Sequence, residues 1–337
     1  MDFFKKQKTE EFRAGDFRPR ELSVNRRQGA KEQESQKVKG DNRFVFGLLL
    51  GTIFLSVGFW LWGNLSRNEL GLAGSTKIII LPTPTPTPIP RKTEEISDKI
   101  FALTNSLKGN YGVYVYNLTA KHSYALLGDQ EFTAASLIKL PVILTLYQEV
   151  EKGKMSLDDK YTLRQADKRS GAGGLQYRPV GTVYTFRQLA EVMGQQSDNT
   201  AFAAMSYILG EAKIQSVIDN LGMAKTSFTR NETTPNDMGL FWRKLYGGSV
   251  VTREHREEIL SFLTKTAYED RIPAGVPEGT RVAHKIGNET GVFSDAGIVF
   301  ADKPFILVIL SKNALEREAK TALPEITKAV WGFETSP

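Results

Sequence analysis

The chain contains no cysteine and only three histidines in 337 residues. Without cysteine it has no disulfide, no thiol nucleophile, no thiolate metal ligand and no lipid-bearing cysteine. His122, His255 and His284 lie far apart and form no pair at the helical spacing of a zinc hydrolase. A serine-histidine-aspartate triad needs no such spacing, but no nucleophile-elbow pattern marks a serine for one. We therefore expect neither a metal centre nor a cofactor.

A strongly basic folded region is lacking as well. Residues 1–92 carry 16 lysines and arginines against 9 acidic residues, whereas residues 93–337 carry 28 against 29. The net charge of +6 and the pI near 9.2 are therefore properties of the N-terminal part. Because nucleic-acid binding requires a basic patch on a folded surface, the sequence predicts no nucleic-acid partner.

Residues 44–63 form a long apolar run of 20 residues without a charge. That length matches the hydrocarbon core of a bilayer, and two tryptophans near its far end suit the membrane interface. Twelve lysines and arginines precede the run, which predicts a cytoplasmic tail at residues 1–43 and an extracytoplasmic remainder. A cleaved signal peptide is the alternative, but both its basic region and its apolar run would be unusually long.

The segments on either side of this run are polar or rich in proline. The tail, residues 1–43, has few apolar residues to pack, so we expect it to be disordered. Beyond the run, residues 64–93 read as a linker, in which residues 82–90 alternate proline with threonine or isoleucine. Such a stretch favours extended polyproline II at ~3.1 Å per residue. The linker would hold a folded domain, residues 94–337, away from the membrane.

The pattern in this domain predicts an α+β fold. Alternating residues at 111–118 and 122–127 indicate a β-hairpin, and three more strands and a helix follow near the end of the chain. Between them lies a helical block at about residues 140–245, in which Thr185 and Gln188 form a capping box. We expect an antiparallel five-stranded sheet made from both ends of the domain, flanked by helices, with an inserted all-helical subdomain. The late elements are expected at residues 281–285, 292–300, 305–311 and 315–331.

Ser136 and Lys139 are three residues apart at the predicted start of the helical block. On a helix this spacing puts the hydroxyl and the amine on one face. The surrounding residues are mostly apolar, which favours burial, and a buried lysine loses its proton more easily than one in water. The neutral amine could then accept the serine proton and make the hydroxyl a nucleophile.

Two further motifs follow along the chain. Ser197-Asp198-Asn199 offers a hydroxyl that can relay a proton and an amide that can bond a peptide-like ligand, although such a tripeptide is also a common helix N-cap. Lys285-Ile286-Gly287 is expected to end the strand at 281–285, where glycine would let a ligand approach and lysine would supply positive charge. A plain strand end is the alternative for this motif.

Taken together and in this order, the three motifs resemble the S-x-x-K, S-D-N and K-T-G set of class A β-lactamases and penicillin-binding proteins. The resemblance extends over about residues 94–335. It implies that Ser136 attacks a carbonyl to form an acyl-enzyme, with Lys139 as proton acceptor and Ser197 as relay to the leaving nitrogen. It further implies that the substrate is bound by Asn199, Lys285, Gly287 and Asn288, the last with the backbone N–H of Ser136 as an oxyanion donor.

The chain departs from the family pattern at two places. The E-x-x-L-N pattern that supplies the deacylation base is missing from the short interval before Thr233, where Glu232 is the remaining acid and the candidate base. Glu289 is a weaker candidate. Ile286 replaces the hydroxyl-bearing residue of the third motif, and no arginine occurs at residues 293–296 to compensate. Acyl-enzyme formation is therefore better supported than its rapid hydrolysis.

The sequence leaves three functions open. The leading one is a monomeric, membrane-anchored, extracytoplasmic serine hydrolase of the β-lactamase type, acting on β-lactams or related amides. The second is a D-Ala-D-Ala peptidase or penicillin-binding protein with slow deacylation, favoured by the anchor, the linker and the missing loop glutamate. The third is a binding module for cell-wall peptides without turnover, which Ile286 and the short interval before Thr233 favour. Retention of Ser136, Lys139, Ser197 and Asn199 argues against it.

Overall fold

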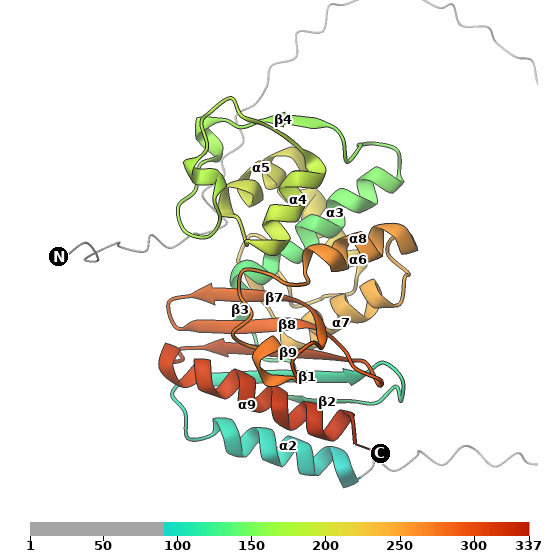
Figure 1. Ribbon diagram of the computed structural model, residues 1–337, viewed down its shortest axis with the longest axis vertical. Helices are drawn as coiled ribbons and strands as arrows, with labels where there is room; N and C mark the ends of the chain where they lie inside the picture. The colour runs from blue at the N-terminus through green and yellow to red at the C-terminus, as the bar shows by residue number, and fades with distance from the viewer. Residues whose placement is uncertain (1–90, 337) are drawn as a thin grey trace, which may run out of the picture. The chain divides into compact units, whose positions relative to one another are not determined.

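The computed structural model describes residues 91–336 (Figure 1). The predicted tail, membrane span and residues 64–90 of the predicted linker lie outside these residues. Within the described part, no helix combines the length and apolar character that crossing a bilayer requires. The first described helix, α2 (Arg91–Thr104), begins close to the predicted start of the domain at residue 94.

A five-stranded antiparallel sheet crosses the described part, in the order β2-β1-β9-β8-β7 (Figure 1). The central pair joins the two ends of the domain, since β1 pairs with β9 from Asn110 opposite Lys312 to Asn117 opposite Phe305. This confirms the α+β fold and the sheet predicted from the sequence. The strands are β1 (Asn110–Asn117), β2 (Ser123–Leu126), β7 (Arg281–Glu289), β8 (Val292–Phe300) and β9 (Phe305–Lys312).

Each face of the sheet has its own apolar core. Helices α2 and α9 (Glu316–Glu334) cover one face (Figure 1), where alternate residues of β1 and β9 pack against apolar residues spaced three or four apart on the helices. The opposite face packs against the helical block. The final helix is confirmed and runs a few residues past its predicted end at Trp331.

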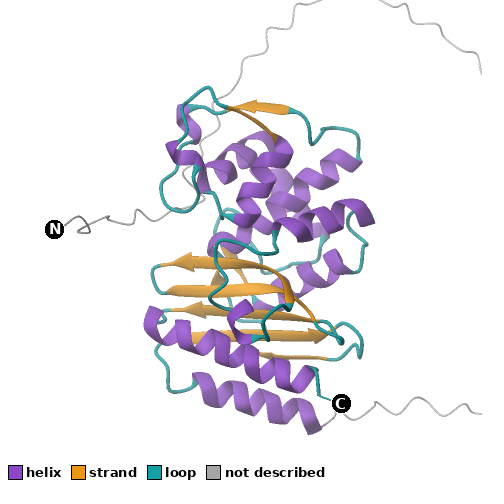
Figure 2. Cartoon of the chain, in the orientation of Figure 1, coloured by secondary structure: helices purple, strands orange, loops and turns teal. Residues whose placement is uncertain are grey.

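The helical block lies on the far side of the sheet from α2 and α9 (Figure 2). The predicted capping box is confirmed at the start of α4, where the Gln188 backbone N–H donates to Thr185 Oγ1 at 3.2 Å. The block contains α3 (Lys139–Glu151), α4 (Phe186–Gln195), α5 (Asn199–Leu209), α6 (Glu211–Asn220), α7 (Pro235–Tyr246) and α8 (Arg253–Phe262), with the short 3₁₀ helices η3 (Gln165–Asp167) and η4 (Leu175–Tyr177). A further 3₁₀ helix, η5 (Pro273–Gly275), precedes β7.

Two small sheets interrupt the predicted run of helices. One joins β4 (Lys160–Thr162) to β5 (Val183–Thr185), and the other joins β3 (Phe132–Thr133) to β6 (Glu232–Thr233). The second pair matters for the site, because β3 leads directly into the 3₁₀ helix η2 (Ala135–Ile138), which contains Ser136.

The strand expected at residues 281–285 continues to Glu289, so the prediction that the third motif ends it was wrong. Pairing with β8 extends along the whole strand, as far as Glu289 opposite Val292. Gly287 is tolerated inside this strand for a packing reason: a Cβ there would lie 2.8 Å from the Ala134 carbonyl oxygen. The glycine therefore lets the edge strand approach the segment that carries Ser136.

Candidate active site

Ser136 lies in η2, and Lys139 is the first residue of α3. The step from one helix into the next keeps the two side chains on one side, with Lys139 Nζ 3.0 Å from Ser136 Oγ. Ser136 is partly exposed, whereas Lys139 is only 2% exposed. The geometry meets the sequence-based expectation of a buried lysine on the same face as the serine.

The Lys139 amine faces neutral oxygen atoms from two segments. Besides Ser136 Oγ, it contacts Ser197 O at 2.6 Å, Ser197 Oγ at 3.1 Å and Asn199 Oδ1 at 2.7 Å. Burial lowers the pKa of Lys139 to about 7, although the negative charges of Asp198 and Glu289 act to raise it. A substantial fraction of the amine is therefore neutral near neutral pH and able to accept the serine proton.

The second motif fills the turn between α4 and α5. Ser197 has a positive φ of 55°, and the Asp198 carboxylate caps α5 by accepting from the Ala201 N–H at 2.8 Å. Asp198 also accepts from the Leu175 N–H at 2.8 Å. The N-cap interpretation thus applies to Asp198, and this fixed turn points the Ser197 and Asn199 side chains at Lys139.

Lys285 lies on β7 and is 2% exposed. Burial lowers its pKa well below the usual value, and the positive charge of Lys139 lowers it further. Two residues along the strand, a Cβ on Gly287 would lie 2.8 Å from the Ala134 carbonyl oxygen, so β7 packs against the segment that carries Ser136. Its Nζ donates to the Ile286 carbonyl at 3.2 Å. All three motifs therefore converge, with the first two on the helical side and the third on the edge strand.

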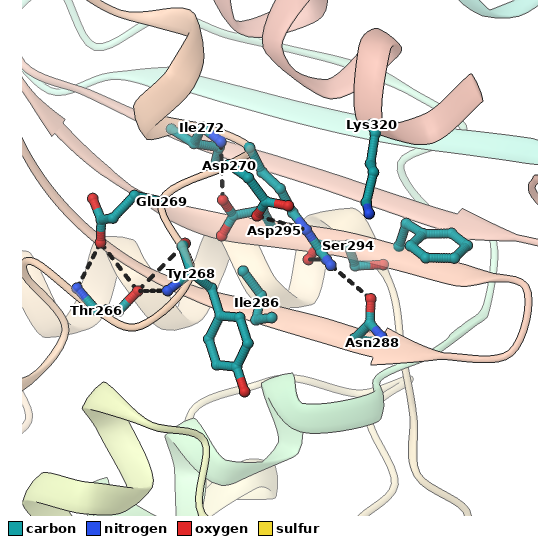
Figure 3. Close-up of polar contacts among 12 residues, drawn as sticks. Thr266, Tyr268, Glu269, Asp270, Ile272, Ile286, Asn288, Ser294, Asp295 and Lys320 are labelled. Carbon is teal, nitrogen blue, oxygen red and sulfur yellow. Dashed lines mark hydrogen bonds and ion pairs between the residues drawn. The ribbon is translucent and has the colours of Figure 1, made fainter. Parts of the chain in front are cut away.

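Arg271 reaches the third motif from the loop before β7, a contact that the sequence-based search of residues 293–296 missed. Its guanidinium donates to the carbonyl oxygens of Gly287 at 3.0 Å and Ser294 at 2.7 Å, and to Asn288 Oδ1 at 2.6 Å. Figure 3 shows Asn288 and Ser294 on the adjacent strands. Arg271 is 6% exposed, so it fixes the end of β7 from inside the fold. No local sequence signal indicates this contact.

His284 anchors the same loop to the sheet. Its Nδ1 lies 2.9 Å from Asp295 Oδ1, and Nε2 lies 3.3 Å from Glu269 Oε1. Burial alone would lower the pKa of His284, but the charges of Asp295 and Glu269 raise it to about 9. Asp295 also accepts from the Ile272 N–H at 3.0 Å (Figure 3), so this ion pair holds the loop that delivers Arg271.

Two polar residues of the short interval before Thr233 differ in exposure: Glu232 is partly exposed, and Asn231 is buried. Glu232, on β6, accepts from Arg230 Nε at 2.7 Å with its side chain 36% exposed. Its assignment as deacylation base stays a prediction. The preceding Asn231 is buried, and its Nδ2 donates to Glu289 Oε1 at 3.3 Å.

Among residues 91–336, no group of three or more histidine and acidic side chains is arranged to hold a metal ion.

Comparison with known proteins places this chain in a family of enzymes. Residues 94–333 match the model of the Beta-lactamase enzyme family. Curated relatives include a beta-lactamase of Proteus vulgaris, 25% identical over 69% of this chain and 84% of the relative, and Beta-lactamase 3 of Bacillus cereus, 24% identical over 68% and 78%.

Solved structures of beta-lactamases and of PBP-A resemble this chain as well. A beta-lactamase from Sphaerobacter thermophilus has a TM-score of 0.69 and 26% identity, covering 72% of this chain and 98% of that one. PBP-A has a TM-score of 0.67 and 25% identity, covering 72% and 95%. A mutant of PBP-A, described as an acyl-enzyme complex with penicillin G, has a TM-score of 0.67 and 26% identity, covering 74% and 98%.

Proposed function

Because this chain belongs to the beta-lactamase enzyme family, we propose that Ser136 attacks the carbonyl carbon of a β-lactam or related amide and forms an acyl-enzyme. The observation that carries the proposal is the contact of 3.0 Å between Ser136 Oγ and a buried lysine whose pKa is about 7. The neutral Lys139 amine accepts the hydroxyl proton as the Oγ–carbon bond forms. Such a base typically contributes about 100 to 10,000-fold in rate.

The proton then passes to the leaving nitrogen. Lys139 Nζ lies 3.1 Å from Ser197 Oγ, which supports Ser197 as the relay that donates to the nitrogen as the amide bond breaks. We assign the oxyanion to the backbone N–H groups of Ser136 and Asn288, donors that act most strongly on charge developing in the transition state. Asn199 would orient the substrate amide with the part of its side chain that does not face Lys139.

Lys285 would recognise an anionic substrate. Burial and Lys139 lower its pKa in the free protein, but a bound carboxylate favours the charged form and raises the pKa again. Lys285 would therefore hold its proton more tightly when an anion occupies the site. Gly287 would contribute to the substrate site by letting the strand edge lie close to the Ser136 segment, because the Ala134 carbonyl oxygen occupies the space of its missing Cβ.

A second candidate is a D-Ala-D-Ala peptidase or penicillin-binding protein that deacylates slowly. The missing E-x-x-L-N pattern and the similarity to PBP-A favour it. The four contacts of Lys139 argue against the third alternative, a binding module for cell-wall peptides without turnover.

Mass spectrometry of the full-length protein with a penicillin separates these functions. We expect a covalent adduct in the wild type and in the control Ser249→Ala, which changes an exposed serine, and none in Ser136→Ala. A short-lived adduct with product release identifies a β-lactamase, and a persistent one identifies a penicillin-binding protein. An adduct that survives in Ser136→Ala would overturn the assignment of the nucleophile.

We also propose that the catalytic domain is extracytoplasmic, on the basis of the charges around residues 44–63. The absence of cysteine makes this testable with single substitutions and a membrane-impermeant maleimide on intact cells. Glu95→Cys, on the exposed surface of α2, should be labelled, and Ser35→Cys in the tail should be labelled only after permeabilisation. The reverse pattern would contradict the orientation.

A further inference from the structure

Asn231 and Glu289 meet beside the segment that carries Ser136, although 58 residues separate them in sequence. Asn231 immediately precedes β6, Glu289 is the last residue of β7, and Asn231 Nδ2 donates to Glu289 Oε1 at 3.3 Å. The negative charge of Glu289 acts to raise the pKa of Lys139, which places the carboxylate within electrostatic reach of the catalytic amine.

Backbone contacts fix this pair against the segment that carries Ser136. The Ala134 N–H donates to the Asn231 carbonyl oxygen at 2.8 Å. On the other side of Ala134, a Cβ on Gly287 would lie 2.8 Å from its carbonyl oxygen, and Glu289 follows Gly287 on the same face of β7. Ala134 is therefore held between Asn231 and β7, two residues before the nucleophile.

Asn231 has an acceptor that the protein leaves unused. The residue is only 7% exposed, yet its Oδ1 has no hydrogen-bond partner among the described residues. Buried acceptors are nearly always hydrogen-bonded, because an acceptor removed from water without a partner loses its hydration and gains nothing in return. An amide oxygen beside a carboxylate offers two acceptors, which together suit the two protons of one water molecule.

Glu232, the acid favoured by the sequence, lies in different surroundings. Its Oε2 already accepts from Arg230 Nε at 2.7 Å, and its side chain is 36% exposed. Glu232 occupies β6 opposite Thr133 on β3, whereas Glu289 belongs to the strand that packs against Ala134. The contact between β7 and Ala134 thus favours Glu289 over Glu232 as a partner for chemistry at Ser136.

We propose that Glu289 and Asn231 hold the water that hydrolyses the acyl-enzyme, with Glu289 as its general base. The inference rests on the proposed formation of an acyl-enzyme at Ser136. Glu289 takes one proton from the water as the water oxygen bonds to the acyl carbon. When the bond from that carbon to Ser136 Oγ breaks, Oγ takes up the proton held by Glu289, relayed through Lys139. The products are the free acid, the serine hydroxyl and the original carboxylate.

Separate measurement of acylation and deacylation tests this assignment on the full-length protein. A labelled penicillin is mixed with excess protein, and the adduct is followed by mass spectrometry as it forms and decays. We expect Glu289→Gln to slow decay by about 100-fold or more and to change formation less than threefold. Glu278→Gln, which alters an exposed glutamate, should match the wild type in both steps. Thermal melting checks that each variant is folded.

Asn231→Gly keeps a residue that tolerates the positive φ of 54° and removes the amide. The variant should slow decay of the adduct by about 10-fold and leave the rate of adduct formation unchanged. A merely structural role would not affect one step without the other. Glu232→Gln tests the competing base.

Each outcome is decisive. Wild-type decay in Glu289→Gln, or slow decay in Glu232→Gln instead, would overturn the assignment to Glu289. A wild-type adduct that never hydrolyses would also overturn it while leaving acyl-enzyme formation intact. No adduct in the wild type would remove both proposals.

Discussion

The site has a helical side, made by the first two motifs, and a strand side, made by the third motif on β7. The two sides differ in how many of their polar side chains contact one another. On the helical side, contacts of 2.6 to 3.1 Å join one lysine amine to oxygen atoms of three residues: Ser136, Ser197 and Asn199. On the strand side, the third motif has lost a hydroxyl at Ile286, draws on Arg271 from a distant loop, and ends at an acid, Glu289. The contrast suggests that the helical side determines whether an acyl-enzyme forms, and that the strand side determines which substrate enters and how long the acyl group stays.

The largest expected effect comes from breaking the helical side. Lys139→Met keeps the length and apolar stem of the side chain but removes the amine, so acylation by a penicillin should fall about 100 to 10,000-fold. Stopped-flow or quenched mass spectrometry measures the acylation rate constant, with Lys99→Met on the exposed side of α2 as control. Acylation at the wild-type rate in a folded Lys139→Met protein would refute the lysine as base.

The pH dependence of the acylation rate is a second test of Lys139 as the base. In the proposed mechanism Lys139 acts as a base in its neutral form, and its pKa is about 7. Below that value the protonated fraction dominates, so the acylation rate should fall about tenfold for each unit of pH, and above it the rate should level off. Rate constants measured between pH 5 and pH 8 check this, because His284 titrates higher, at about 9. A flat profile over this range would contradict a lysine base.

Substitution of Arg271 tests whether its hydrogen bonds stabilise the end of β7. Glutamine is too short to reach both carbonyl oxygens, so Arg271→Gln would leave the buried acceptors of Gly287 and Ser294 unpaired. Each unmade bond costs about 1 to 3 kcal/mol, and we expect the free energy of unfolding to drop by about 2 to 4 kcal/mol. Urea denaturation measures the drop, with the exposed Arg253→Gln as control. A loss below about 0.5 kcal/mol would show that the guanidinium does not stabilise this strand.

The helical side could be predicted from the sequence because its signals are local. A spacing of three residues sets the contact between Ser136 and Lys139, and a turn between two helices presents Ser197 and Asn199. The strand at residues 111–118, the capping box at Thr185 and the final helix were also predicted from local sequence, and the structure confirms all three. Local patterns thus predicted the elements and the contact between Ser136 and Lys139.

The strand side was harder to predict because its contacts depend on tertiary pairing. Glycine has a low strand propensity, so Gly287 suggested a strand end, whereas pairing with β8 carries the strand on to Glu289. Arg271 binds carbonyls 16 and 23 residues away, and Asn231 finds its partner 58 residues away. No periodic pattern encodes such contacts. The membrane span predicted at residues 44–63 lies outside the described residues and stays a prediction.

The smallest expected effect comes from restoring the missing hydroxyl. Ile286 lies on β7 beside Asn288 (Figure 3), and Ile286→Thr would add a donor where the resemblance places contact with a substrate carboxylate. One such hydrogen bond contributes about 1 kcal/mol, so the KM for a penicillin should fall about fivefold. Ile286→Val is the matched control, because valine has the shape of threonine without the hydroxyl. If the threonine and valine variants bind equally, the strand side does not recognise the carboxylate through this position, and Lys285 would carry that recognition alone.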